Sequence, residues 1–140
     1  MGVIRDRSNQ RDMKKVVAYC RSANEPQYGP SAVQKQVDAI LGGAWKNVNR
    51  FYLDAGVSGI TLERPALQQL IADCQAGKIT TIVTQDPERL SRDSTKLLVL
   101  LDIFREADVR VEFMTGGERI PFLLTVLSAV SELEKRRAAK

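Results

Sequence analysis

Arginine is the residue type whose placement in this sequence could do chemistry. Arg89 and Arg92 lie three positions apart in residues 87–93, which open a predicted helix, so both would share one helical face. A helix N-terminus favours an anion, and the planar arginine fork binds phosphate at two points. The alternative is a solvated first turn in which the two arginines pair with Glu88 and Asp93. This stretch alone leaves both interpretations open.

The absence of histidine limits the chemistry further. With no histidine in the chain, a serine or cysteine nucleophile cannot be activated by imidazole, and no metal can be held by one. Cys20 and Cys74 lie in apolar segments and are predicted to be buried, reduced thiols, and no four-ligand zinc spacing occurs. Any catalysis must therefore use arginine, lysine, carboxylate, tyrosine or serine side chains.

Composition indicates one globular domain. The chain has 140 residues, 44% of them hydrophobic and 27% charged, and a net charge of +4 that permits an anionic partner. No apolar run approaches the roughly 20 residues that span a membrane, and the N-terminus lacks a signal-peptide core. We therefore expect a cytoplasmic protein with a flexible leader over residues 1–15 and a single domain over 16–140.

Apolar segments alternate in type along the chain. Strands are predicted over residues 16–20, 50–53, 79–84 and 109–113. Helices are predicted to begin after Ser31, at Pro65, after Asp93 or Ser94, and at Pro121. The residues expected on their buried faces include Leu41 in the first helix and Leu97, Leu98, Leu101 and Phe104 in the third. This order predicts an α/β fold, a mainly parallel sheet of at least four strands with helices on both faces.

Three unusual loops follow predicted strands, at residues 21–30, 54–64 and 85–93. Functional groups gather at the carboxyl ends of parallel strands, so Arg21 and Arg64 are expected near Arg89 and Arg92. Arg21, Arg89 and Arg92 should reach one phosphate-sized anion, with Arg64 farther off on its glycine-flanked loop. The alternative is a scatter of surface salt bridges. Ser58 lies in the second loop, where small residues allow close backbone approach, although an ordinary turn has the same composition.

Several segments, read together, resemble the motifs of serine site-specific recombinases of the resolvase–invertase family. Residues 19–23 (Tyr-Cys-Arg-Ser-Ala) resemble its Tyr-x-Arg-x-Ser motif, and residues 88–93 (Glu-Arg-Leu-Ser-Arg-Asp) its Asp-Arg-Leu-x-Arg-Asp motif. Residues 54–59 resemble Asp-x-x-x-Ser-Gly, and residues 63–67 resemble Asp/Glu-Arg-x-x-Leu. Gln36 falls where the family's first helix has glutamine. Residues 127–134 resemble the start of its long oligomerisation helix. The resemblance covers residues 16–137 in the family's order.

The resemblance implies a reaction and its participants. In this family a serine hydroxyl attacks a DNA phosphate, giving a 5′-phosphoserine link and a free 3′-hydroxyl, without metal or nucleotide cofactor. Arg21, Arg89 and Arg92 would then hold the phosphate as charge develops on it. The residues implied to support or position this clamp are Tyr19, Gln36, Ser58 and Arg64. The implied partners are DNA and a homodimer or tetramer formed through the C-terminal helix, for which Leu123, Val126, Leu127 and Val130 are candidates. A C-terminal DNA-binding region would be missing from this chain.

Two positions depart from the family pattern. A gapless match puts Ala23 where the nucleophilic serine is expected. Ser22 is the obvious substitute, but side chains alternate along an extended segment, so Ser22 should point away from Tyr19, Arg21 and Ala23. Only a bulge after Arg21 would turn it round. Glu88 replaces aspartate and carries the charge on a longer arm.

The sequence therefore supports three hypotheses. The first is a recombinase catalytic domain that cleaves and rejoins DNA, impaired here by Ala23. The second is a non-catalytic relative that keeps the fold for DNA binding or assembly. The third is a flavodoxin-like small-molecule or signalling domain, which the lack of a glycine-rich phosphate fingerprint after the first strand disfavours. Whether this chain is an active enzyme stays open at the level of sequence.

Overall fold

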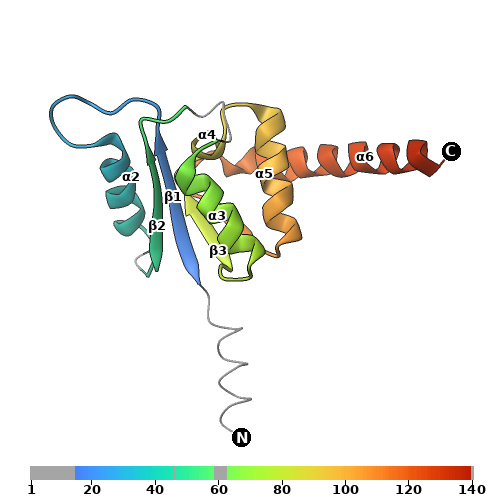
Figure 1. The fold of residues 1–140 in the computed structure, drawn as a ribbon, viewed down its shortest axis with the longest axis horizontal. Helices are drawn as coiled ribbons and strands as arrows, with labels where there is room; N and C mark the ends of the chain where they lie inside the picture. The colour runs from blue at the N-terminus through green and yellow to red at the C-terminus, as the bar shows by residue number, and fades with distance from the viewer. Residues whose placement is uncertain (1–14, 46, 59–62, 140) are drawn as a thin grey trace, which may run out of the picture.

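A four-stranded parallel sheet forms the centre of the molecule in a computed structural model that describes residues 15–45, 47–58 and 63–139. Its strands are β1 (Val16–Ser22), β2 (Arg50–Ala55), β3 (Thr81–Thr84) and β4 (Arg110–Phe113), in the order β2-β1-β3-β4 (Figure 1). The sequence prediction of a parallel α/β fold is confirmed. The leader expected over residues 1–15 lies almost wholly outside the described residues.

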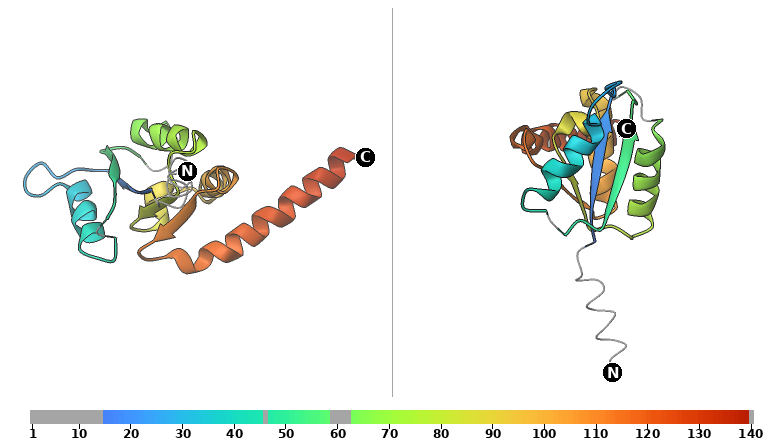
Figure 2. Two further views of the ribbon diagram at one scale, coloured as in Figure 1. Left: turned by 90° about the horizontal axis from the view of Figure 1, so that it is seen from below. Right: turned by 90° about the vertical axis from the view of Figure 1, so that its left-hand side faces the viewer.

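Helices cover both faces of this sheet. They are α2 (Ala32–Leu41), α3 (Pro65–Gln75), the short α4 (Pro87–Leu90), α5 (Ser94–Glu106) and α6 (Ile120–Ala139), which a 3-10 turn (Gly117–Arg119) precedes. The right-hand view of Figure 2 shows α2 and α3 on opposite sides of β1 and β2. Figure 1 shows α6 leaving the body of the domain. In the described part of the chain, no helix is long and apolar enough to cross a bilayer.

Alternation along β1 divides the core into two clusters, because successive side chains of a strand face opposite sides. Val17 and Tyr19 pack with the apolar residues of α3 and α5, among them Leu67, Leu70 and Phe104. Val16, Ala18 and Cys20 pack with Val33, Val37 and Ile40 of α2. The face to which a β1 residue points is therefore fixed by whether its number is odd or even.

Helix starts follow the sequence signals. The Ser31 hydroxyl accepts from the Gln34 amide at the start of α2, and the Asp93 carboxylate accepts from the first-turn amides of α5.

Two buried positions were predicted wrongly. Leu41, the last residue of α2, is 40% exposed, and Leu98 is only half-buried, whereas Leu100 is fully buried on α5. Both helices are rotated slightly from the expected face.

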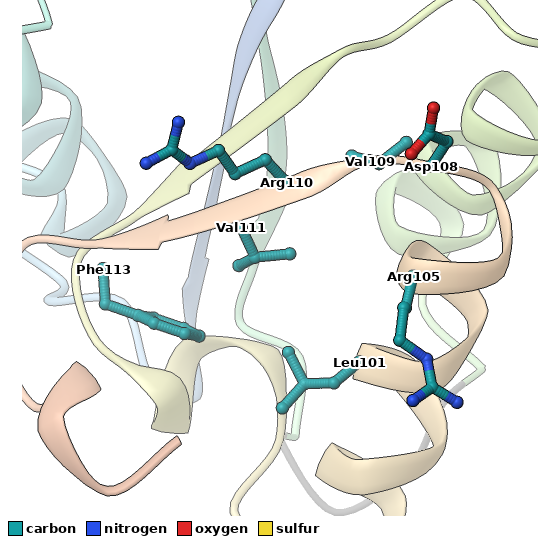
Figure 3. A pocket seen from close by; sticks show the side chains of 7 residues that line it. All are labelled: Leu101, Arg105, Asp108, Val109, Arg110, Val111 and Phe113. Atoms are coloured by element: carbon teal, nitrogen blue, oxygen red, sulfur yellow. The ribbon is translucent and has the colours of Figure 1, made fainter. Parts of the chain in front are cut away.

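A cavity of about 290 Å³ lies between α5 and the edge strand β4 (Figure 3). The residues lining it are Leu101, Arg105, Asp108, Val109, Arg110, Val111 and Phe113. Its walls are largely aliphatic and aromatic, and the guanidinium groups of Arg105 and Arg110 point away from each other (Figure 3). None of the residues predicted for the functional site lines it.

Candidate phosphate site at the carboxyl end of the sheet

Tyr19, Asp54 and Arg64 form a buried hydrogen-bonded group between β1, β2 and α3. The Tyr19 hydroxyl donates to Asp54 Oδ2 at 2.7 Å and accepts from Arg64 Nη1 at 3.2 Å. Asp54 also accepts from the backbone amides of Ala66 and Leu67, at 2.9 and 3.0 Å. It thereby caps α3, whose N-cap residue Arg64 makes no side-chain cap bond. The carboxylate fixes where α3 begins and hence where Arg64 sits.

Arg64 lies in the interior rather than on a distant loop. Its side chain is fully buried, and besides Tyr19 it donates to the carbonyls of Arg89, at 3.1 Å, and Leu90. The expectation that Arg64 stands farther off is therefore wrong. The reason is that Pro65 starts α3 directly after it, so the helix and Asp54 hold it against α4.

Arg21 is buried beside Arg64 and holds the same short helix. Its Nε and Nη2 donate to the carbonyls of Arg89 and Glu88 at 3.1 and 2.9 Å, and Nη1 donates to the Val57 carbonyl at 2.9 Å. It is only 2% exposed. Arg21 therefore ties the loop after β2 to α4, and in this arrangement it lies beneath the surface that a phosphate would reach first.

Gln36 of α2 holds the backbone of Arg21. Its Oε1 accepts from the Arg21 amide at 3.1 Å, and its Nε2 donates to the Arg21 carbonyl at 2.8 Å. The neighbouring strand β3 ends opposite Tyr19, with Thr84. Gln36 thus supplies both hydrogen bonds that a continued strand would have made, and its positioning role in the reaction stays a prediction.

Arg89 and Arg92 do not share a helical face, which corrects the prediction from their spacing. Ser91 adopts an extended conformation that ends α4, and Arg92 follows it outside any helix, before Asp93 caps α5. Arg92 is exposed, whereas the Arg89 side chain is 31% exposed and lies 3.6 Å from Asp86 Oδ2. The two arginines that reach the surface therefore come from α4 and from the bend after it.

Four guanidinium groups gather at this end of the sheet. Burial lowers the pKa of Arg21, and the neighbouring charges of Arg64, Arg89 and Arg92 lower it further, which places all four guanidinium groups within electrostatic reach. Burial, followed by the hydrogen bond to Asp54, raises the pKa of Tyr19 well above its usual range. Tyr19 is therefore a neutral donor, not a base.

Two buried donors lack a partner among the described residues, namely Arg64 Nε and Arg89 Nε. The 3.6 Å between Arg89 Nε and Asp86 is too long for a hydrogen bond, so the two observations agree. Buried unpaired donors are uncommon and are costly without a partner. Both lie in the arginine cluster, which we define as Arg21, Arg64, Arg89 and Arg92. An anion bound there would supply acceptors for these donors.

Ser22 and Ala23 face different environments at the end of β1. Pairing with β2 continues without a bulge, with Arg21 opposite Asp54 and Ser22 opposite Ala55. Ser22 is 3% exposed, and its hydroxyl accepts from the Gly56 amide at 3.2 Å. Ala23 is exposed. An even-numbered residue of β1 faces α2, so Ser22 lies on the other side of the sheet from the Arg21 side chain.

Two further predicted site residues are at the surface. Ser58 is exposed in the loop that follows Val57, whose carbonyl binds Arg21. Glu88 is exposed, and its carbonyl, rather than its carboxylate, is the group that contacts Arg21. The structure thus brings Tyr19, Arg21, Gln36, Arg64 and Arg89 together, with Arg92 alongside, and leaves Ser58 and Glu88 at the rim.

Sequence reasoning missed the role of two residues of this network. Thr84 is fully buried and donates from Oγ1 to the Tyr19 carbonyl at 2.8 Å. In the sequence Asp54 stands out only as the first residue of a loop motif, although it links Tyr19 to the start of α3. A buried aspartate at a strand end, upstream of a helix that lacks a capping side chain, is the signal that could have indicated it.

Comparisons with known proteins identify the family of this architecture. The model of the "Resolvase, N terminal domain" family matches residues 16–140. A protein of Bacillus subtilis (strain 168), assigned by name as a DNA recombinase, is 31% identical over 127 residues, which cover 87% of this chain and 25% of that protein. The R46 site-specific recombinase of Escherichia coli is 30% identical over 115 residues, which cover 76% of this chain and 59% of that one.

A solved structure agrees with these sequence matches. The N-terminal catalytic domain of TP901-1 integrase superposes with a TM-score of 0.69 at 31% identity, covering 89% of this chain and 99% of that domain. This chain belongs to the resolvase N-terminal domain family, the catalytic domains of serine recombinases. It spans between a quarter and about two thirds of the length of the curated relatives that it matches.

Proposed function

We propose that this domain holds a DNA phosphate in the manner of a serine recombinase but does not cleave the strand, because Ala23 occupies the reactive position. The observation that carries the proposal is the difference in exposure between Ser22 and Ala23 at the end of β1. Ala23 is exposed there, whereas the Ser22 hydroxyl is buried on the α2 side and hydrogen-bonded to Gly56. Within β1, no serine hydroxyl is presented on the face to which Arg21 points.

The arginines divide into two groups in this proposal. Arg21 and Arg64 hold the carbonyls of α4 from beneath and so fix the position of Arg89. Arg89 and Arg92 lie nearer the solvent and would meet the phosphate first. Four positive groups in partly buried surroundings would offset the charge that develops on phosphorus, work that a metal ion does in many phosphoryl-transfer enzymes. With serine at position 23, the same arrangement would support strand cleavage.

Arg92→Gln is expected to weaken binding of a 30-base-pair duplex several-fold at low salt. Each phosphate contact contributes about 0.9 to the slope of log affinity against log salt concentration, so that slope should fall by roughly 1. Fluorescence anisotropy over a salt series measures both quantities. Arg105→Gln is the control, since Arg105 is exposed on α5 and already paired with Asp102. An unchanged slope for Arg92→Gln would remove Arg92 from the DNA contact.

We also propose that α6 pairs two copies of the chain. Val130 and Leu133 lie three residues apart on one helical face and are 44% and 55% exposed, on a helix that leaves the domain (Figure 1). The other candidates named from the sequence, Leu123, Val126 and Leu127, have side chains outside the described set. Exposed apolar side chains on a projecting helix are typical of an interface.

Val130→Glu combined with Leu133→Glu is expected to convert a dimer into a monomer. Burying such a side chain is worth about 1.5–3 kcal/mol, so losing two on each copy should raise the dimer dissociation constant at least a hundredfold. Sedimentation velocity over a concentration series measures it. Leu41→Glu with Val99→Glu is the control, since both residues are comparably exposed aliphatics on the body. A parent that is monomeric at every concentration contradicts the pairing.

The remaining partners and the location follow from the same proposal. DNA is the substrate, as the names of the relatives, a DNA recombinase and a site-specific recombinase, suggest for this chain. Cys20 and Cys74 are buried and unpaired, as expected in a reducing compartment, which supports a cytoplasmic location. The chemistry proposed for the arginines uses neither a metal nor a nucleotide cofactor.

A further inference from the structure

A second positively charged site lies at the opposite end of the sheet, where the strands begin. A cavity of about 270 Å³ opens there. Its lining includes Lys15, Asn49, Arg50, Tyr52, Asp73 and Lys78. Val17 pairs with Arg50 at this end of the ladder, whereas Arg21 and Ser22 lie at the other end. Strands rise about 3.3 Å per residue, so the four steps from Val17 to Arg21 separate the cavity and the arginine cluster by roughly 13 Å along β1.

Arg50 is held in place at this cavity rather than loose on the surface. Its guanidinium carbon lies 4.6 Å from the centre of the Tyr52 ring, and Nη1 lies 3.5 Å from Asp73 Oδ2. The same carboxylate accepts from the Tyr52 hydroxyl at 2.6 Å and from Gln69 Nε2 at 2.9 Å. The side chain is nevertheless 60% exposed. Stacking and the carboxylate thus fix the plane of the guanidinium while much of it faces solvent.

Asp73 stays ionised and Tyr52 stays neutral in this arrangement. The Tyr52 hydroxyl bond, followed by that of Gln69 and the charges of Lys78 and Arg50, lowers the pKa of Asp73. Burial raises the pKa of Tyr52 to about 12. The carboxylate is therefore already satisfied by its neighbours, and it anchors Arg50 without being available to another cation.

Positive charge exceeds negative charge around the cavity. Lys15, Arg50 and Lys78 face a single carboxylate, Asp73, so three cations against one anion leave a charge of +2. Within the described ranges, neither lysine lies within 4 Å of a carboxylate, and both are exposed. Asn49 accepts from the Val16 amide through Oδ1, which leaves its amide nitrogen as a donor. Three cations and a neutral donor from separate segments are suited to an anion with several oxygens.

We propose that this cavity binds a phosphodiester group of nucleic acid, on a stretch of DNA different from the one at the arginine cluster. The proposal rests on the DNA binding proposed above. A fixed, exposed guanidinium flanked by two exposed ammonium groups suits phosphate oxygens, which accept from arginine at two points and from lysine as a point charge. The domain therefore presents DNA-binding surfaces at both ends of its sheet.

Titration of the isotope-labelled chain with a short duplex, followed by amide NMR, separates the two sites. Signals of Lys15, Asn49 and Lys78 should move with DNA, as should those of Arg89 and Arg92. Lys15→Gln with Lys78→Gln should abolish the first group of shifts, leave the second, and lower the salt slope of binding by about 1–2, at roughly 0.9 per contact.

The control variant makes the same change in net charge away from both sites. It combines Lys35→Gln on α2 with Arg105→Gln on α5. Neither residue lines the cavity of Lys15, Arg50 and Lys78 or belongs to the arginine cluster. Both groups of shifts should therefore remain intact in this variant.

Each other outcome overturns a different statement. Shifts only at the arginine end refute the second site and leave the proposed function standing. Shifts only at Lys15, Asn49 and Lys78 support the second site and refute the arginine cluster as the DNA contact. No shifts at either end refute both. Shifts of Lys15, Asn49 and Lys78 could instead follow protein concentration rather than DNA. That result would identify an acidic surface of another copy as the occupant of the cavity and would also refute the proposal.

Discussion

Ala23→Ser is expected to create a covalent protein–DNA adduct that the parent does not form. The serine hydroxyl would attack phosphorus, forming an oxygen–phosphorus bond as the bond to the 3′ oxygen breaks. The serine gives up its proton and the 3′ oxygen gains one. Alanine has no atom that can make this bond. Loss of a serine nucleophile costs on the order of 10⁶-fold in rate in a well-studied protease, so the difference should be all or none.

The measurement is a denaturing gel of labelled DNA that carries the cognate site. Ser22→Ala is the matched control. The Ser22 hydroxyl is buried against Gly56, so adding Ser22→Ala to the Ala23→Ser variant should leave the adduct unchanged. A parent adduct that disappears in Ser22→Ala would show instead that Ser22 attacks after a change at the end of β1. The absence of an adduct in Ala23→Ser would mean that the arginines cannot support cleavage.

The sheet could be predicted from the sequence because its signals are local. β-branched runs such as residues 79–84 and the capping residues Ser31 and Asp93 act within a few positions of themselves, and the structure bears them out. The facing of Ser22 followed from the two-residue period of a strand, which holds as long as pairing is unbroken. These inferences needed no knowledge of tertiary contacts.

The interior of the site could not be predicted in the same way. Arg64 is buried because Asp54, ten positions earlier, caps the helix that follows it, and because carbonyls of α4 receive its donors. Those partners come from β2 and from α4, so spacing along the chain does not reveal them. Similarly, Arg89 and Arg92 match a helical repeat in sequence, but Ser91 interrupts the helix between them. Long-range hydrogen bonds determine the position of Arg64, whereas the extended backbone of Ser91 separates Arg89 from Arg92.

Two buried arginines, Arg21 and Arg64, bind backbone carbonyls, so the stability of the interior depends on charged groups. Burial lowers the pKa of Arg64, so its charge is held in place against a desolvation cost, and the Tyr19 hydroxyl and Asp54 offset part of that cost. Arg64 donates hydrogen bonds to the carbonyls of Arg89 and Leu90. Stability and function are therefore coupled through one side chain, since the same bonds position the α4 arginine.

Arg64→Met is expected to lower the free energy of unfolding by about 3–5 kcal/mol, a loss typical of removing one partner from a buried charged network. Methionine has similar length but no donors, so the Arg89 and Leu90 carbonyls lose a partner and the Asp54 charge is less well balanced. Domains of this size are stable by only about 5–15 kcal/mol, so much of that margin would be lost. Urea unfolding measures it as a lower midpoint at an unchanged slope.

Two further variants separate the charge from the hydrogen bonds and keep the test informative should Arg64→Met fail to fold. Tyr19→Phe removes the hydroxyl between Asp54 and Arg64 and should cost about 1–3 kcal/mol, because the partners remain buried. Arg105→Met removes a half-exposed arginine and should cost less than about 1 kcal/mol. Arg64→Met within about 1 kcal/mol of the parent would contradict the network, because its carbonyl partners would then have found other donors and Arg64 would not determine the position of α4.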